Sequence, residues 1–321
     1  MTLVESLRDA LPVRDRAAVE HARADADRRP IAYPLGSGQA EEVALSIGLR
    51  PLIRQVLQRR DLGVARARFE RSGFTCEVAP RVYGPSRDGW DGAKSSLPPD
   101  APGARQALFV GRDRARVEEA VACDVAKTDE ADRALGRLLG YPRCCVEAFV
   151  ATSAHRFNTE LYARAVARTR GAAHPRLNGL DLAIFHFVSW SPCAFDCALS
   201  LAYADAVAAR LQRTHAPFVT AVDAALAAPR LVLLDEVQLS LRAERDGEGY
   251  LLRDAWPTAR DRHPHIALDA DAREAVARAL ALVRGAARLA TTPRGLLLDG
   301  ALLAGTEGAF VAPFGLGAPA G

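Results

Sequence analysis

Four of the six cysteines in this 321-residue chain lie in two short segments, each beside a proline that can begin a helix. The first segment is LGYPRCCVEAF, where Gly140 can end one helix and Pro142 can open the next. Cys144 and Cys145 then fall in the first turn of the new helix.

The second segment, SWSPCAFDCALS, follows the same logic about fifty residues later. Ser191 is a suitable N-cap and Pro192 fits the first helical position. The spacing predicts Cys193 in the first helical turn and Cys197, four residues on, on the same helix face. A fold in which all four thiols act together must therefore bring two helix starts to one place.

Cysteines at helix starts are suited to metal chemistry. The partial positive charge of a helix N-terminus favours a thiolate over a thiol, and thiolates bind zinc and iron–sulfur clusters. The predicted cofactor is therefore an iron–sulfur cluster or zinc, and the predicted ligands are Cys144, Cys145, Cys193 and Cys197. Because neighbouring helical residues diverge by about 100°, the pattern leaves open whether both adjacent cysteines bind.

Two alternatives to a metal site remain open. The same thiols suit a metal-free thiol–disulfide redox protein, in which a cysteine at a helix start attacks a disulfide. Cysteine is also often buried as a small apolar residue, so a non-catalytic scaffold with packed cysteines is the third possibility. Cys76, in a predicted strand, and Cys123, at a predicted helix end, are expected to pack in this way.

Three polar residues near the cysteines are candidates for moving protons in a catalytic site. His186 precedes the second segment, Glu147 follows Cys144 by one turn, and Asp196 lies beside Cys197. Histidine and carboxylates are common general acids and bases. Acidic residues in a first helical turn are also favoured by the helix dipole alone. Whether the protein is an enzyme therefore stays open, and the sequence names no substrate.

Composition narrows the class of protein. The hydrophobic fraction is 49% and the charged fraction 25%, as in an ordinary globular chain that can form two or three compact units. A formal charge of +3 indicates no clear nucleic-acid surface. No stretch approaches the roughly 20 apolar residues that span a bilayer, and the N-terminus lacks the apolar run of a signal peptide. We expect a cytoplasmic protein, away from membranes, whose partner is an unknown small molecule or redox protein.

The order of predicted elements indicates an α+β chain. A segment rich in glycine and proline at residues 84–105 marks a boundary. We predict an N-terminal α/β part at 1–105, a mainly helical domain bearing the cysteines at 106–228, and a small C-terminal α+β part at 229–321. The middle domain thus lies between two smaller mixed parts.

Apolar spacing predicts the individual elements. The expected helices are helical structure over residues 39–72 and helices at 113–124, 129–139 and 269–287. The expected strands are residues 74–84 and 106–111, two strands within 228–256 joined by an Asp-Gly turn, and short strands within 295–315.

The two cysteine segments together resemble an uncharacterised prokaryotic family, a domain of unknown function with a Gly-Tyr-Pro-x-Cys-Cys segment and a later Pro-Cys-x-x-x-Cys segment. The matching residues are Gly140, Tyr141, Pro142, Cys144, Cys145, Pro192, Cys193 and Cys197. Ala194 stands where a hydroxyl residue is expected. The resemblance covers residues 109–211 and implies that the cysteine-bearing helices share one domain, but it supplies no activity.

Overall fold

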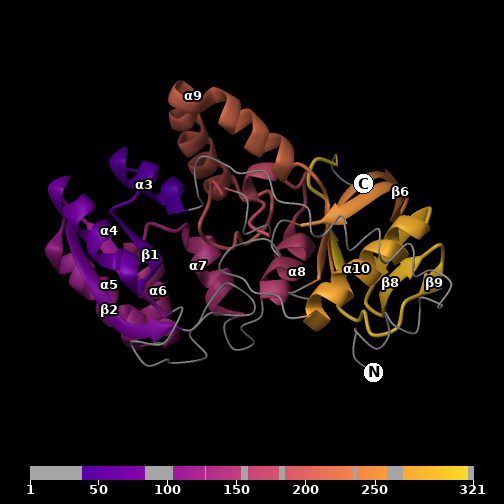
Figure 1. Cartoon of the computed structure of the whole chain (residues 1–321), viewed down its shortest axis with the longest axis horizontal. Helices are drawn as coiled ribbons and strands as arrows, with labels where there is room; N and C mark the ends of the chain where they lie inside the picture. Colours follow the sequence, from indigo (N-terminus) through magenta and orange to yellow (C-terminus); the bar gives the residue numbers. More distant parts are fainter. Residues whose placement is uncertain are drawn as a thin grey trace.

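The computed structural model describes residues 38–83, 104–126, 128–152, 158–180, 185–233, 237–258 and 270–316. Within these ranges the chain combines helices with two antiparallel sheets, which confirms the predicted α+β class. Figure 1 shows one sheet at each end of the molecule and helices between them. Residues 1–37 and 84–103, about which the sequence also makes predictions, lie outside the described part.

A three-stranded sheet forms the N-terminal end. Its order is β1-β3-β2, and both pairs are antiparallel, so the central strand is the one that begins at the predicted boundary. The strands are β1 Leu52–Gln58, β2 Thr75–Tyr83 and β3 Arg105–Gly111, and the helices around them are α3 Gly38–Ser46, α4 Arg59–Arg71 and α5 Arg114–Ala126. The predicted strands near 74–84 and 106–111 are therefore confirmed, as is the helix near 113–124.

The helical structure predicted across residues 39–72 is wrong over 52–58, where β1 runs. Gly48 has a φ of 74°, which ends α3, and Pro51 cannot donate the backbone hydrogen bond that a continuing helix needs. Leu52 and Ile53 are both almost fully buried. The chain therefore gains more by pairing β1 with β3 than by remaining helical.

The middle of the molecule is helical. It contains α6 Asp129–Leu138, α7 Arg143–Val150, α8 Asn158–Arg168, the short 3-10 helix η3 Pro175–Leu177 and α9 Ala198–Leu226. The predicted helix at 129–139 is confirmed as α6, whose N-cap Thr128 accepts a hydrogen bond from the Ala131 amide. The long α9 bends at His215, just before Pro217.

A seven-stranded sheet and one helix form the C-terminal end. Strand order is β10-β4-β5-β6-β7-β8-β9. The elements are β4 Arg230–Val232, β5 Gln238–Asp246, β6 Gly249–Pro257, α10 Ala270–Gly285, β7 Arg288–Thr292, β8 Gly295–Leu298, β9 Ala301–Leu302 and β10 Phe310–Ala312. Asp246 pairs with Gly249, and Gly247 between them has a φ of 59°, so the predicted hairpin with its tight glycine turn is confirmed.

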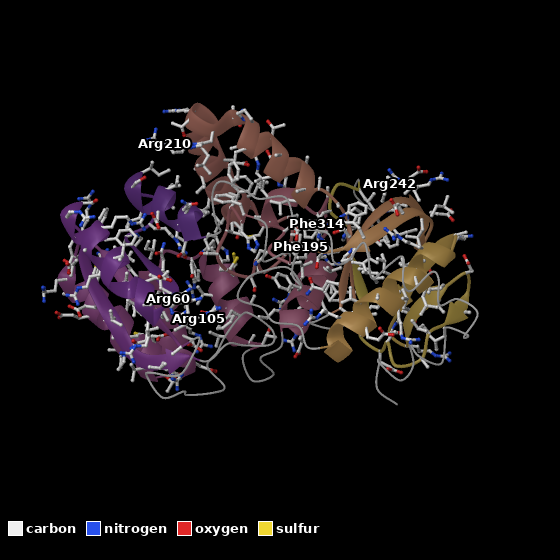
Figure 2. The ribbon with its side chains drawn as sticks, viewed as in Figure 1. Arg60, Arg105, Phe195, Arg210, Arg242 and Phe314 are labelled. Atoms are coloured by element: carbon white, nitrogen blue, oxygen red, sulfur yellow. The ribbon has the colours of Figure 1, made fainter. Side chains whose placement is uncertain are left out.

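The largest group of buried apolar residues surrounds the two cysteine segments. It includes Ala44 of α3, Cys145 and Cys197 of the segments, and Phe314 near the C-terminus. Phe195 packs against Phe314 edge to face, with ring centroids 4.6 Å apart (Figure 2). The core therefore includes residues from all three predicted parts, and the division at 105/106 and 228/229 stays a prediction.

Candidate metal centre

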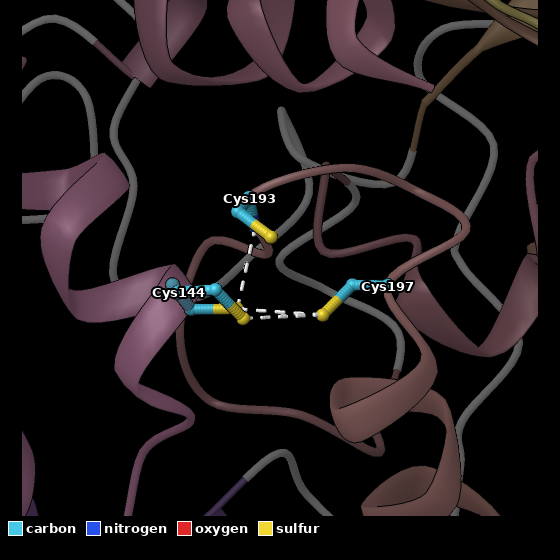
Figure 3. A group of neighbouring side chains, drawn as sticks. Cys144, Cys193 and Cys197 are labelled. Atoms are coloured by element: carbon cyan, nitrogen blue, oxygen red, sulfur yellow. Dashed lines mark hydrogen bonds between the residues drawn. The ribbon is translucent and has the colours of Figure 1, made fainter. Parts of the chain in front are cut away.

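The four predicted cysteines come together. The Sγ atoms of Cys144, Cys145, Cys193 and Cys197 all lie within 4.8 Å of one another, and this group could hold a metal ion. Cys197 Sγ lies 3.7 Å from Cys144 Sγ and 3.8 Å from Cys145 Sγ. In Figure 3, Cys144 on α7 faces Cys193 and Cys197 across a narrow gap.

The first cysteine segment folds as its sequence predicts. Gly140 adopts a φ of 72° after α6, Pro142 is the N-cap residue, and α7 begins at Arg143. Cys144 and Cys145 thus lie in the first helical turn. Although they are neighbours, both sulfurs approach Cys197, so the helix does not direct one of them away from the site.

The second segment folds differently from the prediction. No helix begins at Pro192: α9 begins at Ala198, with Cys197 as its N-cap residue and Cys193 in a preceding turn. The expected helical face shared by the two cysteines is therefore wrong. The turn nevertheless brings both sulfurs to the site.

Hydrogen bonds with residues just after α8 fix the shape of this turn. The Asp196 carboxylate accepts the backbone N–H groups of Arg170 and Gly171, at 2.8 and 2.7 Å. The Phe195 N–H donates to Thr169 Oγ1 at 2.9 Å, and the Phe195 carbonyl accepts the His174 N–H at 2.8 Å. Because the Phe195 N–H and carbonyl are used in these bonds, they are not available to a helix that starts at Pro192, and α9 begins only at Ala198.

Cys145 has two hydrogen-bonding neighbours besides the other thiols. The Cys193 N–H donates to Cys145 Sγ at 3.4 Å, and Ser200 Oγ lies 3.2 Å from the same sulfur. Ser200 Oγ also accepts the indole N–H of Trp190 at 3.1 Å, so its hydroxyl proton can be donated to Cys145 when that sulfur is a thiolate. Contacts of this kind orient a thiolate ligand and spread its charge.

The thiols share their charge unequally. The hydrogen bond with Cys193 lowers the pKa of Cys145. The hydrogen bond with Cys197 and burial outweigh this effect, and the net result is a raised pKa of about 12. Hydrogen bonds from Cys145 and Cys193 lower the pKa of Cys197 strongly. Contact with Cys145 and Cys197, together with burial, raises the pKa of Cys193. Thiols in such close contact resist carrying several negative charges together, and a cation bound among them would offset that repulsion.

A buried arginine beside the site was missed by the sequence reasoning. The Arg50 guanidinium is fully buried and forms an ion pair with Glu41 at 2.6 Å. Its carbon lies 4.7, 5.4 and 5.7 Å from the ring centroids of Tyr141, Trp190 and Tyr203. Burial lowers the pKa of Arg50, but Tyr141, Glu41 and Tyr203 together raise it by more, so the group stays charged. The one hint of this arrangement in the sequence is an aromatic residue shortly before the cysteines of each segment, Tyr141 in the first and Trp190 in the second.

The three predicted acid–base residues have separate surroundings. Asp196 holds the turn as described, and the exposed Glu147 forms an ion pair with Arg133 at 3.1 Å. His186 is buried, with 8% of its surface exposed. Their roles in proton transfer stay predictions, whereas the backbone contacts give Asp196 a positioning role.

A small pocket adjoins the site on the side of Cys193. Its walls come from the C-terminal part of α7, from α8 and from the turn before α9. The polar residues that line it are Thr152, Arg164, Arg168 and Ser191, beside Cys193 itself. Arg164 is already bound to Glu160 and Thr152, at 2.6 and 3.3 Å.

In the described ranges, no helix has the length and apolar character to cross a bilayer. The fold and the site together define an α+β protein with a four-cysteine group able to hold a metal ion. No protein-family model, curated protein or solved structure matches the chain. The functional argument therefore rests on the geometry of the site.

Proposed function

We propose that the four cysteines bind one zinc ion as a tetrahedral tetrathiolate. The observation that carries this proposal is the mutual distance of their sulfurs, all within 4.8 Å, with two separations of 3.7 and 3.8 Å. Four sulfurs about 2.3 Å from a tetrahedral zinc ion are about 3.8 Å from one another. The arrangement thus fits a single ion with little movement.

The same distances favour zinc over an iron–sulfur cluster. Thiolates bound to different irons of a cluster are separated by the irons and the bridging sulfides. The compact group of four, by contrast, leaves room for one central ion. A tetrahedral set of four sulfurs is typical of structural zinc.

Zinc bound here would join α7 to the turn before α9. Cys144 and Cys197, one from each, are 53 residues apart in the sequence. Four protein ligands complete the coordination of zinc, so the ion would act as a structural cross-link. Zinc binding also needs reduced thiols, which supports our further proposal that the protein works in the reducing cytoplasm.

Elemental analysis of protein purified without oxygen tests the proposal. We expect close to one zinc per chain, no acid-labile sulfide, and a cobalt-substituted form whose absorption is that of tetrahedral thiolate coordination. Cys193→Ser should lose the metal, whereas Cys123→Ser, which alters a thiol in α5 outside the site, should keep it. Iron together with acid-labile sulfide would show that the site holds an iron–sulfur cluster and not zinc. A folded protein that takes up no metal would refute the metal site.

One observation favours a second function. Cys144 is exposed and its sulfur lies 3.7 Å from that of Cys197, the arrangement of an attacking thiol and its partner. A metal-free thiol–disulfide protein of this kind would form a disulfide between these two residues under mild oxidant and release it with a dithiol. Peptide mapping of the oxidised protein, compared with its zinc content, separates the two functions.

A further inference from the structure

Cys144 differs from the other three cysteines in its accessibility. It is exposed, whereas Cys145 and Cys197 retain 2% and 9% of their surface and Cys193 is intermediate. In the zinc site proposed above, one ligand would therefore face solvent while the others are shielded by the core. A reagent in solution meets Cys144 first.

Cys144 and Cys145 also differ in the hydrogen-bond donors around their sulfurs. Cys145 Sγ lies within reach of the Cys193 N–H and of Ser200 Oγ. Within the part of the chain that the structure describes, the polar contact of Cys144 Sγ is with another sulfur, that of Cys197. A hydrogen bond to a thiolate occupies the electron pair that would attack an electrophile, so a thiolate without such a donor is the stronger nucleophile.

We propose that zinc-bound Cys144 is a nucleophile that accepts alkyl groups from small carbon electrophiles. The inference rests on the proposed zinc site, because zinc binds cysteine as the thiolate, which is the nucleophilic form of the side chain. The Cys144 sulfur forms a bond to the electrophilic carbon, the bond from that carbon to its leaving group breaks, and the electron pair departs with the leaving group. The product is a neutral thioether, and the site loses one negative charge.

The chemistry of the sulfur, and not a binding pocket around Cys144, selects the electrophile. The pocket beside the site lies against Cys193, on the walls of α7 and α8, and Cys144 does not line it. An alkyl donor therefore approaches Cys144 from solvent and is selected by its chemistry, as a soft carbon bearing a good leaving group. Alkyl halides and alkyl sulfonate esters belong to this class.

The test uses zinc-loaded Cys123→Ser protein, in which a competing thiol is removed and all four site cysteines remain. Methyl methanesulfonate and iodoacetamide are added separately, and the modified residues are mapped by mass spectrometry over time. We expect alkylation at Cys144 to be at least about tenfold faster than at Cys145, Cys193 or Cys197. Cys144→Ser in the same background should lose this fast phase while far-ultraviolet circular dichroism stays unchanged.

The controls separate this inference from the metal site itself. Zinc content is measured before each electrophile is added, and a protein without zinc overturns both proposals. Zinc-loaded protein that reacts first at Cys193, or at all four cysteines at one rate, overturns the role of Cys144 and leaves the zinc site standing. If Cys144→Ser unfolds, mapping of the parent protein alone still decides the order of reaction.

Discussion

The two cysteine segments reach one site through different kinds of local structure. The first is a helical turn set by its own residues, with Gly140 ending one helix and Pro142 leading into the next. The second is an irregular turn whose shape depends on the hydrogen bond from the Phe195 N–H to Thr169 Oγ1 and on those that the Asp196 carboxylate accepts. Geometry set by neighbours in sequence can be read from the sequence, whereas geometry set by a distant segment cannot.

The difference also predicts how each segment responds to change. An eight-residue helix such as α7 is marginal in isolation and needs tertiary packing, but its own sequence already favours it. The turn before α9 has one local backbone hydrogen bond, from the Cys197 N–H to the Ala194 carbonyl, and its other bonds described above are with residues after α8. Substitutions around the second segment should therefore disturb the site more than matched substitutions around the first.

The largest effect is expected for Cys197→Ser. Cys197 contacts both sulfurs of the first segment, at 3.7 and 3.8 Å, and is the N-cap residue of α9. We expect zinc content to fall to near zero and the free energy of unfolding to fall by about 5 kcal/mol, because binding energy of structural zinc is folding energy. Elemental analysis and urea unfolding measure both quantities. Cys144→Ser, at the exposed ligand, should cost less; equal losses would contradict the comparison.

A somewhat smaller effect is expected for Phe195→Ala. The ring is fully buried and packs against Tyr162 and Phe314. Loss of a buried phenylalanine costs about 3–5 kcal/mol, and here it should also loosen the turn and weaken zinc binding. Phe149→Ala is the matched control, since Phe149 is only partly buried in the first segment. A larger loss of zinc affinity in the control would reverse our reading of the two segments.

Asp196→Ala tests the role of the carboxylate at lower cost. Removing it takes the acceptor from the N–H groups of Arg170 and Gly171, which are not fully buried and can bind water instead, so the free energy of unfolding should fall by about 0.5–1.5 kcal/mol. Asp196→Asn retains one oxygen as acceptor and should recover much of this loss. A catalytic carboxylate would behave differently, because the Asn variant would then be as defective as the Ala variant in any assay of turnover.

The smallest effect is a pH dependence from His174, whose backbone N–H binds the Phe195 carbonyl. Burial lowers the pKa of His174, so the folded state favours the neutral ring, which accepts the Arg176 N–H. The stabilisation that comes from keeping the His174 ring neutral is fully present above the ordinary histidine pKa of about 6.5. It is lost as the pH falls from there through the lower pKa that His174 has in the folded state. His174→Asn keeps an acceptor that does not titrate, so the variant should show a flatter stability profile between pH 7 and pH 5.

Much of the fold could be predicted because its signals are local. The turn glycine at Gly247 indicates the β5–β6 hairpin, and alternation in residues 74–84 indicates β2. The grouping of the four cysteines followed from their chemistry, although one of the two expected helix starts was wrong. Chemistry predicted the set of residues more reliably than periodicity predicted their backbone.

The rest depends on partners that are remote in sequence. The apolar residues around β1 fit a helix as well as a strand, and the decision comes from β3, whose Val110 pairs with Ile53. The buried position of Arg50 requires Tyr141, Trp190 and Tyr203 to surround it from three separate segments. A single sequence shows each of these residues but does not show that they lie close together in the folded protein.

The separation of 53 residues between Cys144 and Cys197 also sets an order of events during synthesis. Arg50 and both residues of the adjacent pair leave the ribosome well before Cys197, so the early chain presents two thiols without their partners. Contacts between such distant residues form late in folding, because a long loop must close first. The four-sulfur site is thus completed only when α8 and the turn after it are in place, and occupancy of the site reports that the helical middle of the molecule has assembled.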